Sequence, residues 1–230
     1  MPGNQIAMGF SLGVVIFLFG TPAWTADKTK DDETLRNSAS VFQAMVQGSN
    51  VPRDLLARAN CIIVLPGVKK GGFLVGGTGG RGAMSCRTGK DFKGKWSTPA
   101  MYTIGGASFG LQAGGSSSDF VLLVMTQKGV DAVLQGKTKF GTDATVAAGP
   151  TGATASAASD LLTYGRTSGL FAGVSLGGAI LSEDKDANQR LYDKLVTATE
   201  IVVQNSVQPT SGGRQFLSEL AASKSLASAR

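Results

Sequence analysis

The segment from Leu65 to Gly82, LPGVKKGGFLVGGTGGRG, combines apolar residues with a high density of glycine. Its central pattern is an aromatic residue, a short apolar segment and a Gly-Gly pair, and it occurs again at residues 108–115 and 170–178. Glycine inside a strand permits the close approach of another backbone or a sharp bend. We therefore expect the three copies to be glycine-lined strands of one strongly curved sheet, which the rest of the chain covers.

The composition suits one globular domain with a hydrophobic core, because the 230 residues are 42% hydrophobic and 17% charged. Lysine and arginine outnumber aspartate and glutamate by 22 to 16, which gives a net charge of +6. A basic excess favours anionic partners such as phospholipid headgroups, nucleic acid or acidic glycans, without choosing among them. Nucleic acid is less favoured because no platform of stacking aromatic residues is apparent.

The chain contains no histidine and only two cysteines. The absence of histidine excludes a Ser–His–acid triad, a Cys–His pair and any histidine-ligated metal site. Two cysteines are too few for an all-thiolate zinc site. No convergent pair of acids is apparent either. We therefore predict a binding protein rather than an enzyme, with no catalytic residue, no metal and no cofactor.

Residues 6–20, IAMGFSLGVVIFLFG, form an uncharged apolar run. Its length of about 15 residues is closer to the apolar core of a signal peptide than to the roughly 20 residues of a membrane-spanning helix. We expect residues 1–26 to be a signal peptide cleaved between Ala23 and Ala26. The mature protein is then exported to the bacterial periplasm or cell envelope. An uncleaved membrane anchor is the alternative.

Helical spacing of apolar residues predicts an amphipathic helix over residues 31–47. The inward face comprises Leu35, Ala39, Phe42, Met45 and Val46. Acidic residues 31–33 would lie at its positive N-terminal end. Pro52 then opens a second short helix at its first turn.

Near the C-terminus, a long helix is expected from Asp186 to about Val203, with Asp186 and Gln189 as a capping box. Residues 206–230 are expected to be a linker and tail, in which residues 214–226 can form a terminal helix. Residues 32–205 would then be the folded domain.

Between these helices the pattern predicts mainly strands, with a polar loop at residues 89–94 and a short helix at 127–135. The expected strands are 61–65, 72–76, 82–87, 96–104, 107–115, 119–126, 143–149 and 156–166. The run DFVLLVMT at 119–126 is apolar on both faces, which indicates a central, buried strand. The expected fold class is α+β, with a curved, mostly antiparallel, barrel-like or sandwich sheet, short N-terminal helices and a long helix near the C-terminus.

Three short motifs have a simpler structural interpretation. Residues 77–82 match the dinucleotide pattern G-x-G-x-x-G, but no helix follows, so a tight hairpin turn is expected. Residues 106–110 match G-x-S-x-G, which we reject as a nucleophile elbow because histidine is absent. Asp184, Asp186 and Asn188 match the opening of a calcium loop whose later positions do not fit, so these acids more simply start a helix.

Cys61 and Cys86 are the two thiols. An oxidising compartment favours a disulfide between them. A flat three-stranded meander would hold their strands apart, whereas a curled sheet could bring them together. Spacing alone does not decide between these arrangements, because pairing requires Cα atoms within ~7 Å.

Lys69 and Lys70, with Arg53, Arg58 and Arg81 nearby in the sequence, could form a site for an anionic headgroup. The alternative is a solvated basic turn that keeps a strand edge soluble.

Four segments together resemble the SYLF domain family. They are VPRDLLARANCIIVLPGVKKGGFLVGG, WSTPAMYTIGGASFGLQAGGSSSDFVLLVM, GTDATVAAGPTG and YGRTSGLFAGVSLGGAILSEDKDAN. The resemblance runs from about Asp32 to Tyr192. It implies an exported, lipid-binding protein of the bacterial type. Eukaryotic relatives bind phosphoinositides through an N-terminal amphipathic helix and basic residues, and the yeast ones bind actin.

The segment 32–47 corresponds to that amphipathic helix but has Arg36 as its one base. The resemblance therefore favours the lysine pair as the headgroup contact. Actin binding is not expected of an exported bacterial-type protein. Oligomeric state stays open.

The sequence thus predicts non-enzymatic binding of anionic phospholipid or phosphoinositide-type headgroups at a membrane surface. Lys69 and Lys70 would contact phosphate, helped by Arg53, Arg58 or Arg81, while Phe73 or the first helix supplies apolar contact. The alternative is a structural or scaffold protein that docks a protein partner through the sheet or the terminal helix.

Overall fold

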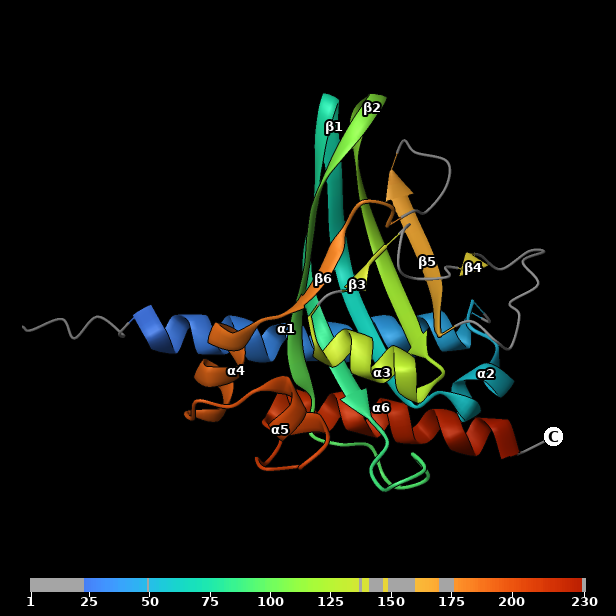
Figure 1. The fold of residues 1–230 in the computed structure, drawn as a ribbon, viewed down its shortest axis with the longest axis vertical. Helices are drawn as coiled ribbons and strands as arrows, with labels where there is room; N and C mark the ends of the chain where they lie inside the picture. Colours follow the sequence, from blue (N-terminus) through green and yellow to red (C-terminus); the bar gives the residue numbers. More distant parts are fainter. Residues whose placement is uncertain are drawn as a thin grey trace, which may run out of the picture.

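A computed structural model describes residues 23–48, 50–136, 138–140, 147–148, 160–169 and 176–228 (Figure 1). Its helices are α1 Ala23–Gln47, α2 Arg53–Arg58, α3 Gln127–Leu134, α4 Lys185–Tyr192, α5 Ala198–Val202 and α6 Ser211–Ser228. Its strands are β1 Cys61–Cys86, β2 Ala100–Val124, β3 Thr138–Lys139, β4 Ala147–Ala148, β5 Leu161–Gly169 and β6 Ile180–Glu183. The α+β class and the curved, mostly antiparallel sheet are confirmed.

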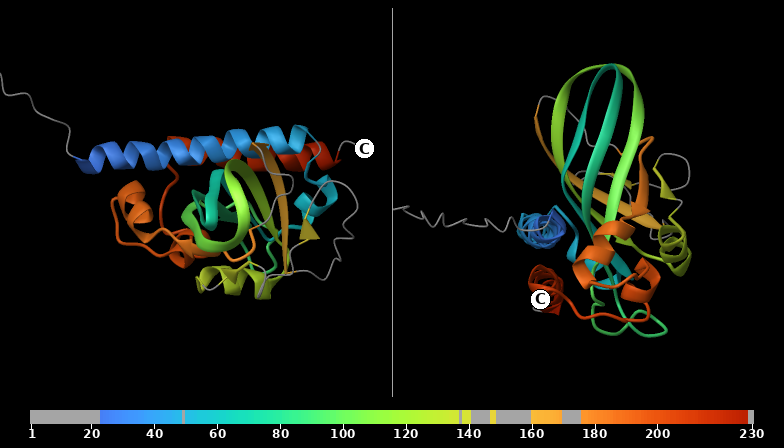
Figure 2. Two further views of the ribbon diagram at one scale, coloured as in Figure 1. Left: turned by 90° about the horizontal axis from the view of Figure 1, so that it is seen from above. Right: turned by 90° about the vertical axis from the view of Figure 1, so that its left-hand side faces the viewer.

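Two long strands, β1 and β2, dominate the sheet. They pair antiparallel from Cys61 opposite Val124 to Met84 opposite Ala100. The register shifts between Leu65 and Val68 and between Gly72 and Leu74. Both strands rise from the helical base as one curled arm and return to it (Figures 1 and 2). The expectation of several shorter strands here was wrong, because bulges and glycine-rich bends turn the chain without interrupting its pairing.

The two halves of β1 come back together at the base of the arm. A Cβ atom added at Gly82 would lie 1.9 Å from the carbonyl oxygen of Val64, and one added at Gly80 would lie 3.1 Å from the Cα of Val68. Cys61 and Cys86, the ends of β1, form a disulfide with Cα atoms 3.9 Å apart. The curled arrangement is therefore the observed one, and close backbone approach is what Gly80 and Gly82 permit. The expected hairpin turn at 77–82 was wrong, because these residues lie within β1.

Within the described ranges the sheet contains six strands, and β2 pairs with β1, β5 and β6. Strand β3 pairs with β6, and β4 adds to β5 in the parallel sense. The second half of β2 is thus central, as the run DFVLLVMT predicted. The rest of the expected strands at 143–149 and 156–166, and most of the third glycine-rich copy, lie outside the described residues.

Both faces of the sheet are buried, so residues alternate between two cores. Ile63 and Leu122 belong to the core beneath α3 and α5, whereas Val64 and Leu123 belong to the core beneath α1 and α6. Figure 2 shows α1 and α6 side by side on one side of the sheet and α3 on the other. This separation places the surfaces beside α1 and beside α3 on opposite faces of the molecule.

Helix α1 is longer than expected. The five predicted inward residues, Leu35, Ala39, Phe42, Met45 and Val46, are all buried. The helix, however, begins at Ala23, so residues 31–33 lie inside it and do not interact with its N-terminal end. The two buried or half-buried acids have other partners in the fold, which are described below. No helix among the described residues is long and apolar enough to span a membrane.

The long helix expected from Asp186 to Val203 is two shorter helices. Asp193 has a left-handed backbone (φ 50°), which ends α4. The N-cap of α4 is Asp184, whose carboxylate accepts a hydrogen bond from the Ala187 amide. The expected Asp186–Gln189 capping box is therefore wrong. A capping box occurs at α5 instead, between Thr197 and Glu200. The terminal helix is confirmed as α6, with Phe216 and Leu220 buried.

Asp32 of α1 accounts for the docking of α6. Its carboxylate accepts hydrogen bonds from the Gly212 amide (2.9 Å), the Ser211 and Thr210 hydroxyls and the Arg36 guanidinium. Burial alone would raise the pKa of Asp32, but the hydrogen bonds, the one from Thr210 foremost, lower it below its ordinary value. The ionised carboxylate therefore stabilises the N-terminal end of α6.

We expect the free energy of unfolding to fall as the pH drops below about 4, the ordinary pKa of an aspartate. A depressed folded-state pKa contributes stability above the unfolded pKa, and this stability is lost as the folded group becomes protonated. Asp32→Asn should flatten this pH dependence in urea unfolding curves. Glu33→Gln, an exposed neighbour on α1, is the matched control. Equal pH dependence in both variants would contradict this role.

Candidate anion-binding surface

Lys69 and Lys70 lie on β1 just beyond the bulge at residues 66–67. Gly67 has a left-handed backbone (φ 58°), and its amide donates to Asp119 Oδ1 at 2.9 Å. Pairing with β2 resumes at Val68, which is buried, and places Lys69 opposite Ser117. Lys69 is exposed and Lys70 is half-buried. Within the described part of the chain, neither ammonium has an ion-pair partner.

An open depression of about 480 Å³ lies between β1 and the middle of α1. Lys69 and Arg81, both predicted site residues, line it together. Thr34, Asn37 and Ser40 of α1 add hydroxyl and amide groups. The site therefore offers cations and neutral hydrogen-bonding groups, the set that an anionic oxygen can use.

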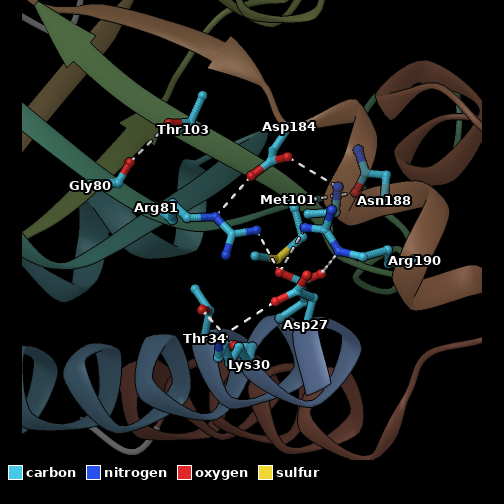
Figure 3. A network of polar contacts seen from close by, with 12 residues as sticks. Asp27, Lys30, Thr34, Gly80, Arg81, Met101, Thr103, Asp184, Asn188 and Arg190 are labelled. Carbon is cyan, nitrogen blue, oxygen red and sulfur yellow. Dashed lines mark hydrogen bonds and ion pairs between the residues drawn. The ribbon is translucent and has the colours of Figure 1, made fainter. Parts of the chain in front are cut away.

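Arg81 is held by acidic partners (Figure 3). Its Nε donates to Asp184 Oδ2 at 2.9 Å and its Nη2 to Asp31 Oδ1 at 2.5 Å. Burial alone would lower the pKa of Arg81, but its hydrogen bonds and charge interactions with these two carboxylates raise it. Arg190 of α4 also binds Asp31, with Nε 2.7 Å from Oδ2. This network joins α1, β1 and α4 and fixes one wall of the depression.

The other predicted site residues lie elsewhere. Arg53 and Arg58 are the two ends of α2, which follows the C-terminal end of α1, and neither lines the depression. Phe73 lies in the part of the arm beyond Lys70, where the structure describes the backbone and not the side chain. The structure thus brings together Lys69 and Arg81 of the predicted set.

The contribution of α1 to this surface was not predicted from the sequence. Thr34, Asn37 and Ser40 recur at roughly helical spacing beside the apolar face, so the polar stripe was visible as a pattern. Its position over Lys69 was not visible, because the two segments meet only through the packing of α1 on β1.

The described residues contain no cluster of acids, cysteines or histidines suited to a metal ion. Asp184 caps α4, and Asn188 Oδ1 accepts from the buried Met101 amide at 2.7 Å. Asp184 and Asp186 therefore form the start of helix α4, as the sequence predicted. Residues 106–110 lie within β2, without the strand–turn–helix context of a nucleophile elbow.

Comparison with known proteins identifies the family. The family model for Ysc84, described as "Las17-binding protein actin regulator", matches residues 105–223. The chain belongs to the Ysc84/SYLF family. The resemblance found in the sequence motifs is therefore confirmed.

Relatives of this Ysc84/SYLF chain occur in yeasts and mammals. Human SH3 domain-containing YSC84-like protein 1 is 35% identical over 167 residues, which are 69% of this chain and 47% of the relative. LAS seventeen-binding protein 3 of Saccharomyces cerevisiae is 33% identical over 168 residues, 69% of this chain and 36% of the relative. An SH3 domain-containing protein of Schizosaccharomyces pombe is 33% identical over 170 residues, 70% of this chain and 39% of the relative.

The chain thus spans less than half the length of these relatives. Their names describe binding and regulatory proteins rather than enzymes. No solved structure matches the chain.

Proposed function

We propose that this Ysc84/SYLF domain binds anionic phospholipid headgroups at a membrane surface of the cell envelope, without catalysing a reaction. The observation that carries the proposal is the pair of ammonium groups at Lys69 and Lys70, which have no acidic partner among the described residues. Lys69 lines the polar depression, whereas Lys70, the next residue of β1, does not. Each ammonium can donate hydrogen bonds to phosphate oxygens without first breaking an ion pair. Arg81, held by Asp31 and Asp184, would contribute through its position in the wall of the depression.

The shape of the arm supports contact with a surface. The β1–β2 arm extends away from the helical base (Figure 1). Beyond Lys70 the chain continues as Gly-Gly-Phe-Leu-Val, and Val75 pairs with Phe109 of β2. Lys69 and Lys70 precede this apolar segment in the chain. The arm could therefore contact lipid headgroups through its cations and the boundary of the acyl chains through its apolar residues.

The binding energy expected from these cations is small. Each lysine near an anionic surface contributes about 1 kcal/mol, within one Debye length of the headgroups. Two such contacts give weak, salt-sensitive association. Removing both should reduce the bound fraction by roughly tenfold or more at low salt.

Liposome co-sedimentation tests the proposal. Vesicles of phosphatidylcholine, with or without phosphatidylglycerol, would be compared at low and high salt. Lys69→Ala/Lys70→Ala should lose binding to the anionic vesicles. Lys93→Ala/Lys95→Ala removes the same charge from the exposed loop between β1 and β2 and should bind like wild type. Phe73→Ser should weaken binding at both salt concentrations.

Equal losses in both lysine variants would show that net charge, not this surface, drives association. A wild-type protein with no affinity for any vesicle would reject lipid binding. The description of the family as a Las17-binding actin regulator favours a protein-docking scaffold as the second candidate. That candidate predicts a discrete partner in cross-linking experiments and no affinity for lipid.

A further inference from the structure

A second cavity lies on the face of the sheet opposite α1. It has a volume of about 470 Å³ and is bounded by the loop after β1, by α3 and by α5. The loop is shaped by two left-handed residues, Gly89 (φ 89°) and Phe92 (φ 52°). A volume of this size is within the range that holds small organic ligands. The cavity is separate from the depression that Lys69 lines.

Arg87 lines this cavity and is 8% exposed. Its guanidinium lies over the Trp96 ring, with Cζ 4.3 Å from the ring centroid. Its buried Nε has no hydrogen-bond acceptor, and among the described residues no carboxylate pairs with this arginine. Stacking on the indole does not satisfy the N–H groups, because they point outward in the guanidinium plane.

A buried cation without a counter-ion is costly, and burial lowers the pKa of Arg87. Two half-buried arginines elsewhere in the fold, Arg81 and Arg190, each pair with a carboxylate. Arg87 is thus positioned to bind an anion that the described part of the chain does not provide. A guanidinium fork suits a carboxylate in particular.

The charges around the cavity restrict the charge of the ligand. Arg87 and Lys90 contribute +2 and Asp131 contributes −1, which leaves +1. Asp131 accepts a hydrogen bond from the Gln127 side chain at 2.8 Å, so its carboxylate has a partner already. A single negative charge is matched by this set, whereas a dianion would be repelled by Asp131.

The remaining walls are apolar. Phe92, Val130, Leu134 and Val202 line the cavity, and Val203 lies at its edge with 54% of its surface exposed. A single exposed apolar side chain is ordinary on a protein surface. Val203, however, continues the apolar lining of the cavity that Arg87 also lines. The lining therefore suits an aliphatic body attached to the anionic group.

We propose that the cavity between the 87–95 loop, α3 and α5 binds a small amphipathic monoanion, an aliphatic carboxylate, through Arg87. The carboxylate accepts hydrogen bonds from the guanidinium N–H groups, with Lys90 nearby. The alkyl chain contacts the apolar side chains of α3 and α5. This site is independent of headgroup binding at Lys69 and Lys70.

The test uses decanoate below its micelle-forming concentration as the probe. Trp24→Phe leaves Trp96 as the one tryptophan, so its emission reports on the ring beneath Arg87. Titration with decanoate should change this emission saturably. Decanol, without the charge, and decyl phosphate, a dianion at pH 8, should bind at least about tenfold more weakly.

Three variants locate the site. Arg87→Gln should weaken decanoate binding roughly tenfold or more, measured by calorimetry. Lys90→Glu and Val203→Glu change exposed side chains, so they should fold normally and also bind weakly. Lys69→Ala/Lys70→Ala should bind decanoate like wild type. Absence of saturable decanoate binding to wild type, or unchanged affinity in Lys90→Glu and Val203→Glu, would overturn the proposal.

Discussion

Gly82→Ala is expected to destabilise the fold by about 3 kcal/mol or more, a large share of the ~5–15 kcal/mol that stabilises a typical domain. The added methyl group would lie 1.9 Å from the Val64 carbonyl oxygen and 2.9 Å from the Leu65 Cα. Both are backbone atoms of the opposing half of β1, so a rotamer change does not relieve the clash. The two halves would have to separate where the disulfide holds their ends together. Urea unfolding followed by circular dichroism measures the loss.

Gly79→Ala is the matched control in the same strand. A Cβ atom there meets no atom within 4 Å, and the backbone of Gly79 is not left-handed. Its stability should stay within about 1 kcal/mol of wild type, or rise slightly, because alanine restricts the unfolded chain. Similar losses in both variants would mean that β-propensity, not close approach of the β1 halves, explains the glycines.

Asp31→Asn is expected to cost about 3 kcal/mol, because it leaves two guanidinium groups without the carboxylate that lies between them. Asp31 is 1% exposed, and it binds Arg81 and Arg190 from elements far apart in the sequence. Asparagine keeps the shape and removes the charge, so Arg190 loses the one acidic partner that it has among the described residues. Thermal unfolding should show the loss at neutral pH.

Asp27→Asn provides the comparison one turn earlier on α1. Asp27 is paired with Lys30 at 3.5 Å, with both side chains largely exposed, and such pairs contribute about 0–1 kcal/mol. A small effect there and a large one at Asp31 would assign the stability to the buried network. Should Asp31→Asn unfold with wild-type stability, the network would have no part in holding α1 against the sheet.

Local patterns in the sequence predicted much of the architecture. The five inward residues of α1 followed from helical periodicity, because burial selects apolar residues at the period of the element. The buried run of β2 followed from its apolar residues on both faces. The end of α4 was not predicted, because it depends on a left-handed backbone at Asp193. That conformation is uncommon for any residue other than glycine, so an aspartate in the sequence does not predict it.

The candidate sites were predicted only in part. Lys69 and Lys70 stood out as adjacent bases, and their ammonium groups have no ion-pair partner among the described residues. Arg81 looked equivalent in the sequence but has two acidic partners, from α1 and from the N-cap of α4. Arg87 was not among the predicted site residues, because a base at the end of a strand is ordinary in a sequence. Its burial without a carboxylate partner among the described residues is a property of the fold.

By itself, then, the sequence determined the element types, the glycine-rich curvature, the lack of histidine chemistry and the family. Those properties depend on residue type and on neighbours close along the chain. The tertiary structure alone decided the Cys61–Cys86 disulfide, the acid partners of each arginine and the two cavities. The disulfide depends on a curled strand that brings together residues more than twenty positions apart in the sequence. The acidic partners depend on packing as well, because the electrostatic environment of a charge is set by all the elements around it.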